Sequence, residues 1–399
     1  MCSVGTLLRT QISTQHSIAF LVLSKKIITL VNVANNAYKN ANIISEEQIL
    51  PEFRGVWGQR GGTFEKDLNL KGRYCYHPFN TITIDSNGDV FPCICQAWLP
   101  ISLGKIWEFD SLDDIPRTAR AREIQRTILD GSYKYCDNNI CGLIASNDLS
   151  GRIDHKPDTI NWINFAIDSS CNLTCPSCRK EFVFVSQGPT YDLRMMIVKH
   201  VTKLIENHGQ FLKFSVSGDG DPFASLIYRE LLSGLDVNNK DVEIEIITNG
   251  VLAKAHWHKM AGIHNKVVRF KISFDAATAE TYNIVRRGGE WDKVLDSAKY
   301  IAAWKQKHYS DMQLTGNFVV QAANYKEMPA YVELLDSLGF DEILFQAVHD
   351  WGTFSDYLSH AVWRSEHPEY LEFLKCLRDP RLNNKKVNLT NLSDIKYAT

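Results

Sequence analysis

From Ile160 onward the chain alternates short apolar runs with longer amphipathic stretches, and this alternation constrains the fold more than any other feature. The apolar runs are rich in β-branched and aromatic residues, which is typical of strands. Between them, apolar residues recur every three or four positions, which predicts helices. The runs predict six strands, at 160–168, 212–218, 242–250, 266–275, 314–321 and 342–348. Strict alternation of strand and helix indicates an α/β fold with a parallel sheet.

Right-handed crossovers would place the helices on one side of this sheet and curve it into an incomplete, (βα)6 barrel. In such folds the loops at the C-terminal ends of the strands carry the chemistry. Four unusual loops follow the first four strands: a cysteine-rich loop at 168–181, "SGDGDP" at 217–222, "TNG" at 248–250 and "SFD" at 273–275. We expect these loops to meet on one face of the sheet.

The balance of charges gives the chain no general attraction to nucleic acid or to an anionic membrane. Lysine and arginine total 44 against 46 aspartate and glutamate, a net charge of -2, so no global field favours nucleic acid or an anionic membrane. The apolar run from Ser17 is interrupted by Lys25 and Lys26 and is shorter than the roughly 20 residues of a membrane span. With no recognisable secretory signal, ten cysteines favour metal binding in the cytoplasm over disulfides.

The organisation along the chain is predicted as five segments. The first third differs from the rest, with short strand signals, an "SNGDV" turn at 86–90 and a helical stretch at 117–129. We predict a small α+β module there. The segments are an N-terminal extension at 1–69, the module at 70–145, a polar linker at 146–158, the barrel at 159–350 and a helical cap or tail at 351–399.

Cys171, Cys175 and Cys178 follow the first strand with the spacing C-x3-C-x2-C. Three thiols in eight residues cannot all pair into disulfides, and three sulfurs from one loop can hold a corner of a cubane iron–sulfur cluster. Such a cluster keeps one iron open to bind a further molecule. A structural zinc knuckle or three buried thiols are the alternatives.

This motif, placed after the first strand of a six-unit βα domain, resembles the radical S-adenosylmethionine (radical SAM) superfamily over residues 160 to about 350. The resemblance implies a 4Fe–4S cluster whose open iron binds the amino and carboxylate groups of S-adenosylmethionine. An electron from the cluster would cleave this cofactor to methionine and a 5'-deoxyadenosyl radical, which abstracts hydrogen from the substrate. The protein would supply ligation, orientation and exclusion of solvent.

The resemblance also implies further contacts with S-adenosylmethionine. The "DGDP" loop resembles the Gly-Gly-Glu-Pro motif whose strand-end backbone binds the methionine amino group, Ser273 would face the ribose, and Arg286 would meet the methionine carboxylate. The loop residues are Asp219, Gly220, Asp221 and Pro222. The sequence departs from the family at Ser177, where an aromatic residue is usual, and at the two aspartates. An ordinary Asp-Gly turn is the alternative for the loop.

A second cysteine set lies in the N-terminal module, at Cys75, Cys93, Cys136 and Cys141. With "DSNGDVFPC", "LGKIWE" and "SLDDI", it resembles the twitch domain, a short form of the SPASM domain that carries an auxiliary 4Fe–4S cluster. Such modules generally follow the barrel, whereas this one precedes it. Four cysteines would close the cluster and favour electron transfer and net oxidation; with three, a free iron could hold the substrate. Cys95 is a fifth candidate, and a zinc ribbon is the alternative for the set.

Together, the two resemblances imply a radical SAM enzyme that acts on a peptide or small molecule. Such an enzyme would receive electrons from a donor such as flavodoxin or ferredoxin. The alternatives are a single-cluster enzyme with a zinc-binding module, and a non-catalytic iron–sulfur carrier or binding protein. His349, Asp350 and Trp351 follow the last strand and are the best substrate-side candidates. Cys376 could donate hydrogen in a redox-neutral reaction, but its helical context favours packing.

Overall fold

The structure is a computed structural model that describes residues 70–137, 141–145, 149, 159–216, 219–308 and 311–397. The chain divides into two compact units, Met1–Arg60 and Gly61–Thr399, and the description below concerns the second. The extension at 1–69, with its apolar run from Ser17, lies outside the described residues, as does most of the expected linker at 146–158. None of the helices described is both long and apolar enough to cross a bilayer.

One sheet runs through the second unit, with the strand order β2-β1-β3-β4-β5-β6-β7-β8-β9. Among the described strands, β1 and β2 pair antiparallel and every other neighbouring pair is parallel. The order is linear in the described residues, so the sheet is not closed. The strands are β1 (Thr81–Asp85), β2 (Val90–Phe91), β3 (Trp162–Ala166), β4 (Leu212–Val216), β5 (Val242–Thr248), β6 (Val267–Ser273), β7 (Gln313–Val320), β8 (Glu342–Ala347) and β9 (Val387–Asn388).

The six strands predicted from the sequence are β3 to β8, in the expected order and all parallel. The prediction of a partial α/β barrel with a smaller N-terminal module is therefore confirmed. The sheet also continues beyond both ends of this run. β1 and β2 of the N-terminal module extend it past β3, and β9 extends it past β8.

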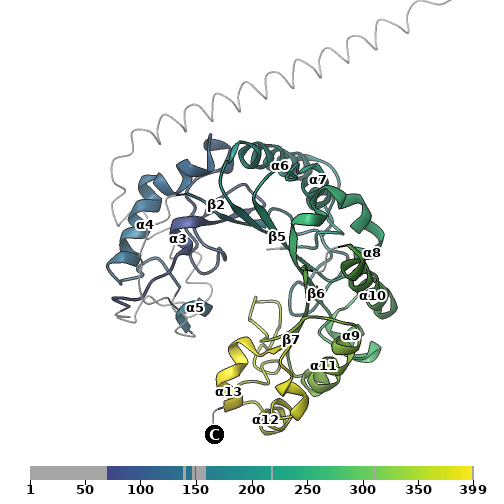
Figure 1. Cartoon of the computed structure of the whole chain (residues 1–399). Coiled ribbons are helices and arrows are strands. Elements are labelled where there is room, and N and C mark those ends of the chain that lie inside the picture. The colour runs from purple at the N-terminus through teal and green to yellow at the C-terminus, as the bar shows by residue number, and fades with distance from the viewer. Residues whose placement is uncertain are drawn as a thin grey trace, which may run out of the picture. The chain divides into compact units, whose positions relative to one another are not determined.

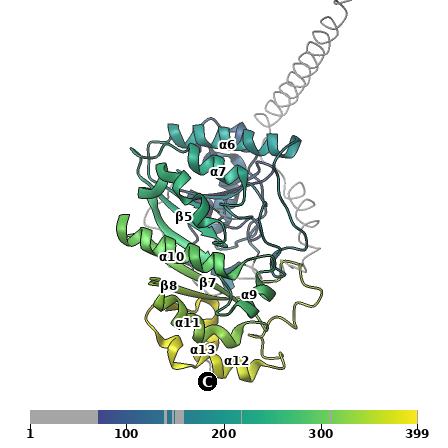
Figure 2. The ribbon, with the colours of Figure 1, turned by 90° about the vertical axis from the view of Figure 1, so that its right-hand side faces the viewer.

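Helices cover the outer face of the curved sheet (Figures 1 and 2). The α-helices are α3 (His77–Asn80), α4 (Ala119–Leu129), α5 (Gly142–Ala145), α6 (Pro189–Asn207), α7 (Leu226–Gly234), α8 (Ala253–His256), α9 (Ala279–Val285), α10 (Trp291–His308), α11 (Met328–Ser337), α12 (Tyr370–Leu377) and α13 (Ser393–Tyr397). The 3-10 helices are η1 (Ile106–Glu108), η2 (Leu112–Arg117), η3 (Trp257–Lys266), η4 (Tyr325–Glu327), η5 (Pro380–Asn383) and η6 (Thr390–Leu392).

Side chains alternate between the two faces of the sheet, as the two-residue period of a strand requires. In β5, Ile244 and Ile246 are fully buried on the helix-covered face, whereas Glu243 and Glu245 are only partly buried on the opposite face. The sheet therefore has an apolar outer core and a polar concave face. The loops at the C-terminal strand ends lie at one rim of that concave face.

The N-terminal module is joined to the barrel by strand pairing. β1 bonds along β3 over its whole length, from the pair Thr81 and Trp162 to the pair Asp85 and Ala166. The ring of His200 on α6 is also 3.1 Å, at a nitrogen, from the carbonyl oxygen of Phe109, which follows η1. A module that precedes the barrel in sequence thus forms its first edge.

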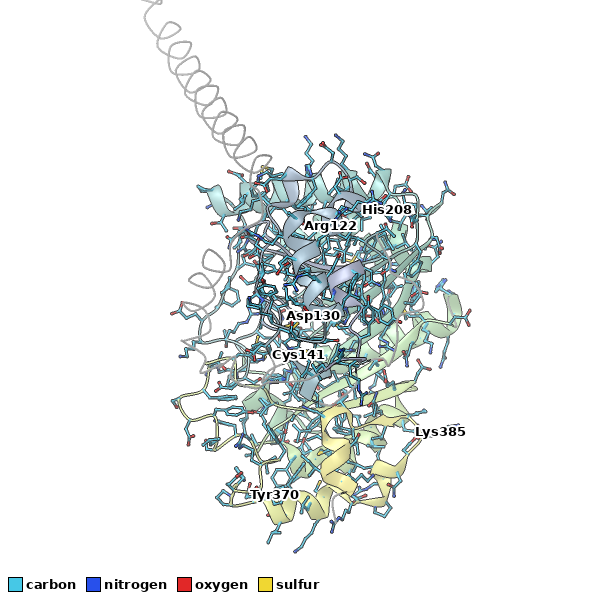
Figure 3. The ribbon with its side chains drawn as sticks, turned by 90° about the vertical axis from the view of Figure 1, so that its left-hand side faces the viewer. Arg122, Asp130, Cys141, His208, Tyr370 and Lys385 are labelled. Atoms are coloured by element: carbon cyan, nitrogen blue, oxygen red, sulfur yellow. The ribbon has the colours of Figure 1, made fainter. Side chains whose placement is uncertain are left out.

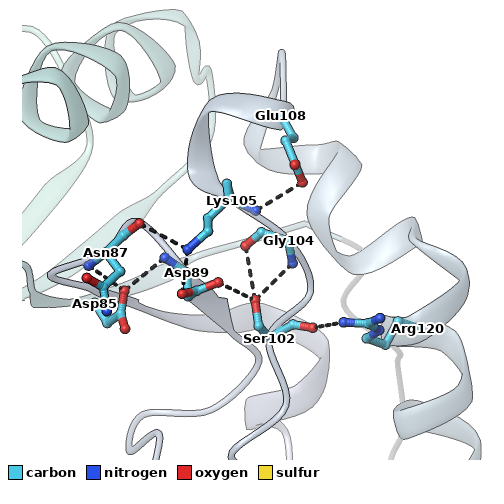
Figure 4. Close-up of polar contacts among 8 residues, drawn as sticks. All are labelled: Asp85, Asn87, Asp89, Ser102, Gly104, Lys105, Glu108 and Arg120. Carbon is cyan, nitrogen blue, oxygen red and sulfur yellow. Dashed lines mark hydrogen bonds and ion pairs between the residues drawn. The ribbon is translucent and has the colours of Figure 1, made fainter. Parts of the chain in front are cut away.

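A polar network fixes the turn between β1 and β2 and the segment after it (Figure 4). The carboxylate of Asp85 accepts bonds from two backbone N–H groups of the turn, at 2.9 Å each. Asp89 pairs with Lys105 at 2.7 Å and accepts a bond from the hydroxyl of Ser102 at 2.9 Å. The "DSNGDV" and "LGKIWE" motifs therefore build the scaffold that leads into Cys93, two residues after β2.

Gly316, in the middle of β7, tests how closely helix α11 packs on the sheet. A methyl group there would lie 1.9 Å from Cδ1 of Leu335 and 2.8 Å from the hydroxyl of Tyr331, both fully buried. We expect Gly316→Ala to lower the free energy of unfolding by about 1–3 kcal/mol, because overpacking forces the helix away from the sheet. Urea unfolding followed by circular dichroism measures this. Exposed Gly209, with nothing within 4 Å of an added methyl, is the control; an equal effect of Gly209→Ala would contradict the packing argument.

Candidate active site and second cysteine cluster

The loop after β3 carries Cys171, Cys175 and Cys178. The first two thiols are buried, with 7% and 6% exposure, and the third is exposed. All three are free. Burial raises the pKa of Cys171 to about 12, with the Asp221 carboxylate adding to the rise, and burial also raises the pKa of Cys175. Negatively charged sulfur is thus unfavourable here without a compensating positive charge.

An ion pair that the sequence reasoning missed anchors the start of this loop. Asp168, two residues after β3, is fully buried and pairs with Arg194 of α6. Its second carboxylate oxygen accepts a bond from the hydroxyl of Ser225, the N-cap of α7. A charged residue directly after an apolar strand was the available signal. The pair ties the cysteine loop to the helices behind it.

The "DGDP" loop lies directly against the cysteine loop, and Gly220 makes this possible. Gly220 has φ of +76°, and an added methyl would lie 2.5 Å from the carbonyl oxygen of Asp168 and 2.7 Å from that of Ser170. Only glycine fits a backbone approach this close. Asp219 is exposed and lies 3.9 Å from Arg179, whereas Pro222 is buried. The structure therefore brings the predicted loop residues to the cysteine motif.

The carboxylate of Asp221 bridges two strand-end loops. One oxygen accepts bonds from the backbone N–H groups of Phe223 and Ala224, at 3.0 and 3.1 Å. The other accepts bonds from the hydroxyl of Thr248 and the N–H of Asn249, both at 2.8 Å. Burial raises the pKa of Asp221, while these four donors oppose the rise. With its carboxylate fully used by the protein, Asp221 positions the loops around the cysteines.

Ser273 and Arg286 also lie at this rim of the sheet. Ser273 ends β6, is buried, and accepts a bond from Asn317 at 3.4 Å. Arg286 pairs with the buried carboxylate of Asp275 at 2.7 Å. Burial alone would lower the pKa of Arg286, but the negative groups of Asp275 and Cys175 hold it above its ordinary value. The structure thus gives Arg286 a protein partner that the sequence did not suggest.

Each sulfur of the motif has a side-chain nitrogen nearby, which is a feature that sequence reasoning missed. Such N–H groups stabilise sulfur ligands and tune the potential of iron–sulfur clusters. The pairs are Asn249 Nδ2 with Cys171 at 3.6 Å, Arg286 Nη1 with Cys175 at 3.8 Å, and Arg179 Nη2 with Cys178 at 3.7 Å. Three free thiols from one loop, each facing a donor, fit an iron–sulfur cluster with one iron left open.

The second cysteine set lines one enclosed pocket of the N-terminal module. Cys75, Cys93, Cys136 and Cys141 all contribute, beside apolar and aromatic side chains that include Trp98 and Tyr133. Burial raises the pKa of Cys75 to about 12 and those of the other three as well. Figure 3 labels Cys141 in this module, away from Tyr370 and Lys385 of the C-terminal segment.

The lining of this pocket fits a cluster held by four cysteines. Cys95 is not among the residues that line it. In the part of the chain that the structure describes, no group of three or more His, Cys, Asp or Glu side chains converges as around one metal ion. A four-iron cubane is larger than a single ion, so its sulfur ligands are more widely spaced. Burial keeps these thiols protonated, and bound iron would take the place of their protons.

The expected substrate-side residues lie in the loop directly after β8. His349 and Asp350 are exposed, and the ring of Trp351, 51% exposed, lies 5.6 Å from that of His349. Cys376 lies in α12, where its thiol donates to the carbonyl oxygen of Tyr325 at 3.0 Å. This contact agrees with a packing role for Cys376.

Two segments of the chain match known protein families. Residues 168–316 match the radical SAM superfamily. They form a radical SAM domain. Residues 75–142, which span all four cysteines of the second set, match the SPASM family, described as an iron–sulfur cluster-binding domain. The cofactors of these two domains are a 4Fe–4S cluster with S-adenosylmethionine at the first and an auxiliary iron–sulfur cluster at the second.

Similar proteins include a probable GTP 3',8-cyclase of Saccharolobus islandicus, 28% identical over 206 residues, which are 50% of this chain and 61% of that protein. A GTP 3',8-cyclase of Listeria welshimeri is 28% identical over 142 residues, 34% of this chain and 40% of that one. The match thus spans less than two thirds of each relative.

Among solved structures, Streptococcus suis SuiB has a TM-score of 0.38 at 14% identity, covering 69% of this chain and 58% of SuiB. The enzyme anSMEcpe with bound AdoMet has a TM-score of 0.34 at 19% identity, covering 48% of this chain and 51% of its own.

Asp221→Asn tests the bridge between the strand-end loops. The side-chain amide would present N–H to two of the four donors, so we expect a loss of about 2–4 kcal/mol in stability and a lower iron content at the radical SAM site. Thermal unfolding and iron analysis of the reconstituted protein measure both. Asp236→Asn, at an exposed position, is the control. Unchanged stability and iron content in Asp221→Asn would show that the bridge is not needed.

Cys93 and Cys95 provide a matched pair for the second cluster. Because only Cys93 lines the pocket, we expect Cys93→Ala to lose up to about four irons per chain and Cys95→Ala to lose none. Iron and acid-labile sulfide after anaerobic reconstitution decide between them. The reverse result would assign the ligand to Cys95.

Proposed function

We propose that the chain is a radical SAM enzyme that cleaves S-adenosylmethionine reductively and abstracts hydrogen from a peptide or small-molecule substrate. The observation that carries this proposal is the cysteine loop itself. Three free thiols lie at one strand end, each beside a side-chain N–H donor, and the Gly220 backbone packs against the start of the same loop, at Asp168 and Ser170. A reduced cluster bound there supplies the electron that yields methionine and the 5'-deoxyadenosyl radical.

The remaining residues of the rim would orient S-adenosylmethionine. The backbone at Asp219 and Gly220 suits the methionine amino group, because no side chain intervenes at the glycine. Ser273, on the concave face, would contact the ribose. Arg286 is held by Asp275, and its Nε has no hydrogen-bond partner among the described residues. This leaves a donor for the methionine carboxylate.

The four-cysteine pocket supports a net oxidation. A cluster closed by Cys75, Cys93, Cys136 and Cys141 has no free iron for substrate, so its role would be to accept an electron. In such an oxidation one hydrogen atom of the substrate would end in 5'-deoxyadenosine and a proton would leave to solvent, and a cluster held by these four cysteines would take up the second electron. A flavodoxin or ferredoxin would supply the initial electron. The nine described cysteines form no disulfide, which is consistent with a reducing, cytoplasmic environment.

Anaerobic reconstitution tests the proposal. We expect about eight irons per chain, falling to about four when Cys171, Cys175 and Cys178 are all changed to alanine. With dithionite and S-adenosylmethionine, the wild type should release 5'-deoxyadenosine and the triple variant should not. Cys376→Ala, outside both cysteine sets, is the matched control.

The other outcomes identify the alternatives. About four irons falling to none, together with bound zinc, would indicate a single-cluster enzyme with a zinc-binding module. Eight irons without release of 5'-deoxyadenosine would indicate an electron carrier or binding protein. Absence of iron from the wild type would overturn the proposal altogether.

A further inference from the structure

The concave face of the barrel carries a network of charged and polar side chains below the rim. The centre of this network is Glu245 on β5. Its carboxylate pairs with Lys213 of β4 at 3.0 Å and with Arg269 of β6 at 3.6 Å, and accepts a bond from the hydroxyl of Ser215 at 3.2 Å. Arg269 also donates to the side-chain oxygen of Gln313 on β7 at 2.8 Å. Each of these groups therefore has a hydrogen-bond or ion-pair partner within the protein.

Lys271 lies on the same face and differs from them. In β6 the flanking Phe270 and Ile272 are fully buried on the helix side, so Lys271 faces the concave side together with Arg269 and Ser273. It is partly buried, yet within the described residues it makes no hydrogen bond and no ion pair. Its ammonium group is therefore a cation on the concave face with no hydrogen-bond or ion-pair partner in the part of the chain that the structure describes.

The position of Lys271 in the sheet explains why the nearby carboxylates do not reach it. Its neighbours across the sheet are Ile247 on β5 and Thr315 on β7, and neither is charged. Glu342 on β8 already accepts bonds from Thr315 at 3.1 Å and from Asn388 at 3.2 Å. Burial lowers the pKa of Lys271, and the carboxylates of Glu245 and Glu342 only partly offset this effect. The ammonium group remains accessible from the open barrel, so a ligand that enters the barrel can reach it.

We propose that Lys271 binds an oxyanion of the substrate, a carboxylate or a phosphate, inside the open barrel. This inference rests on the proposed function and narrows its substrate class. Lys271 is two residues from Ser273 on the same face of β6, one step below the rim where S-adenosylmethionine would lie. An anionic group held by Lys271 would anchor the substrate beneath the 5'-deoxyadenosyl group, with the reacting carbon above it.

Binding of two simple anions tests the inference. Pyrophosphate and succinate are titrated separately into the reconstituted full chain with S-adenosylmethionine, without reductant and at physiological salt, by isothermal titration calorimetry. We expect saturable binding of at least one anion. We also expect Lys271→Met to weaken it by about tenfold or more, as loss of a charge-assisted hydrogen bond implies, and Lys271→Arg to retain most of it.

The control is Lys254→Met, which removes an exposed lysine that pairs with Asp296 on the outer helices. It should leave the affinity unchanged. Lys271→Met should also keep the thermal unfolding midpoint, because the lysine has no partner to lose. If that variant proves unstable, Lys271→Gln provides the same comparison.

Each outcome of the titrations either identifies the kind of anion or overturns the inference. Tighter binding of pyrophosphate indicates a phosphate-bearing substrate, and tighter binding of succinate a carboxylate-bearing one. No saturable binding of either anion, or equal affinity in Lys271→Met, overturns the inference. Because no reductant is present, the result is independent of cofactor cleavage. A protein that binds anions through Lys271 but forms no 5'-deoxyadenosine would overturn the proposed function alone.

Discussion

The site depends on two buried carboxylates that join loops from different strands. Asp168 ties the cysteine loop to α6 and α7, and Asp221 ties the next loop to the end of β5. Both are at most 1% exposed, where an unpaired charge would be strongly destabilising. Their hydrogen bonds therefore hold the loops in one arrangement, and Gly220 fits into the space that remains. The cysteines obtain a defined geometry from these contacts rather than from their own loop alone.

The two cysteine sets are connected by the same sheet. β1 pairs along β3, and the cysteine loop follows β3 directly. Cys93 follows β2, the hairpin partner of β1, so the two motifs are attached to the two strands that flank β1. The unusual order of the domains in the sequence thus has a simple structural counterpart, in which the module supplies the first edge of the sheet.

The polar groups inside the barrel fall into two classes. Most of them, such as Glu245 with Lys213 and Arg269, satisfy one another and stabilise the sheet. Two other groups have no hydrogen-bond or ion-pair partner among the described residues at the atoms concerned: the ammonium of Lys271, which is partly buried, and the buried Nε of Arg286. A buried N–H without a partner, as at Arg286, is rare in folded proteins, and the ammonium of Lys271 is accessible from the open barrel, so we expect bound molecules to contact both positions. They lie at two depths of one open barrel.

The six barrel strands and the two cysteine sets were predictable from the sequence, because a strand has a fixed period and cluster ligands have characteristic local spacing. The sequence did not reveal β9, a two-residue strand without a pattern of its own, or the pairing of β1 with β3. Nor could the sequence show which groups Asp168, Asp221, Asn249 and Lys271 contact. Their roles depend on which groups meet them across 20 to 80 residues of chain, and only the tertiary structure decides whether a buried charge has a partner.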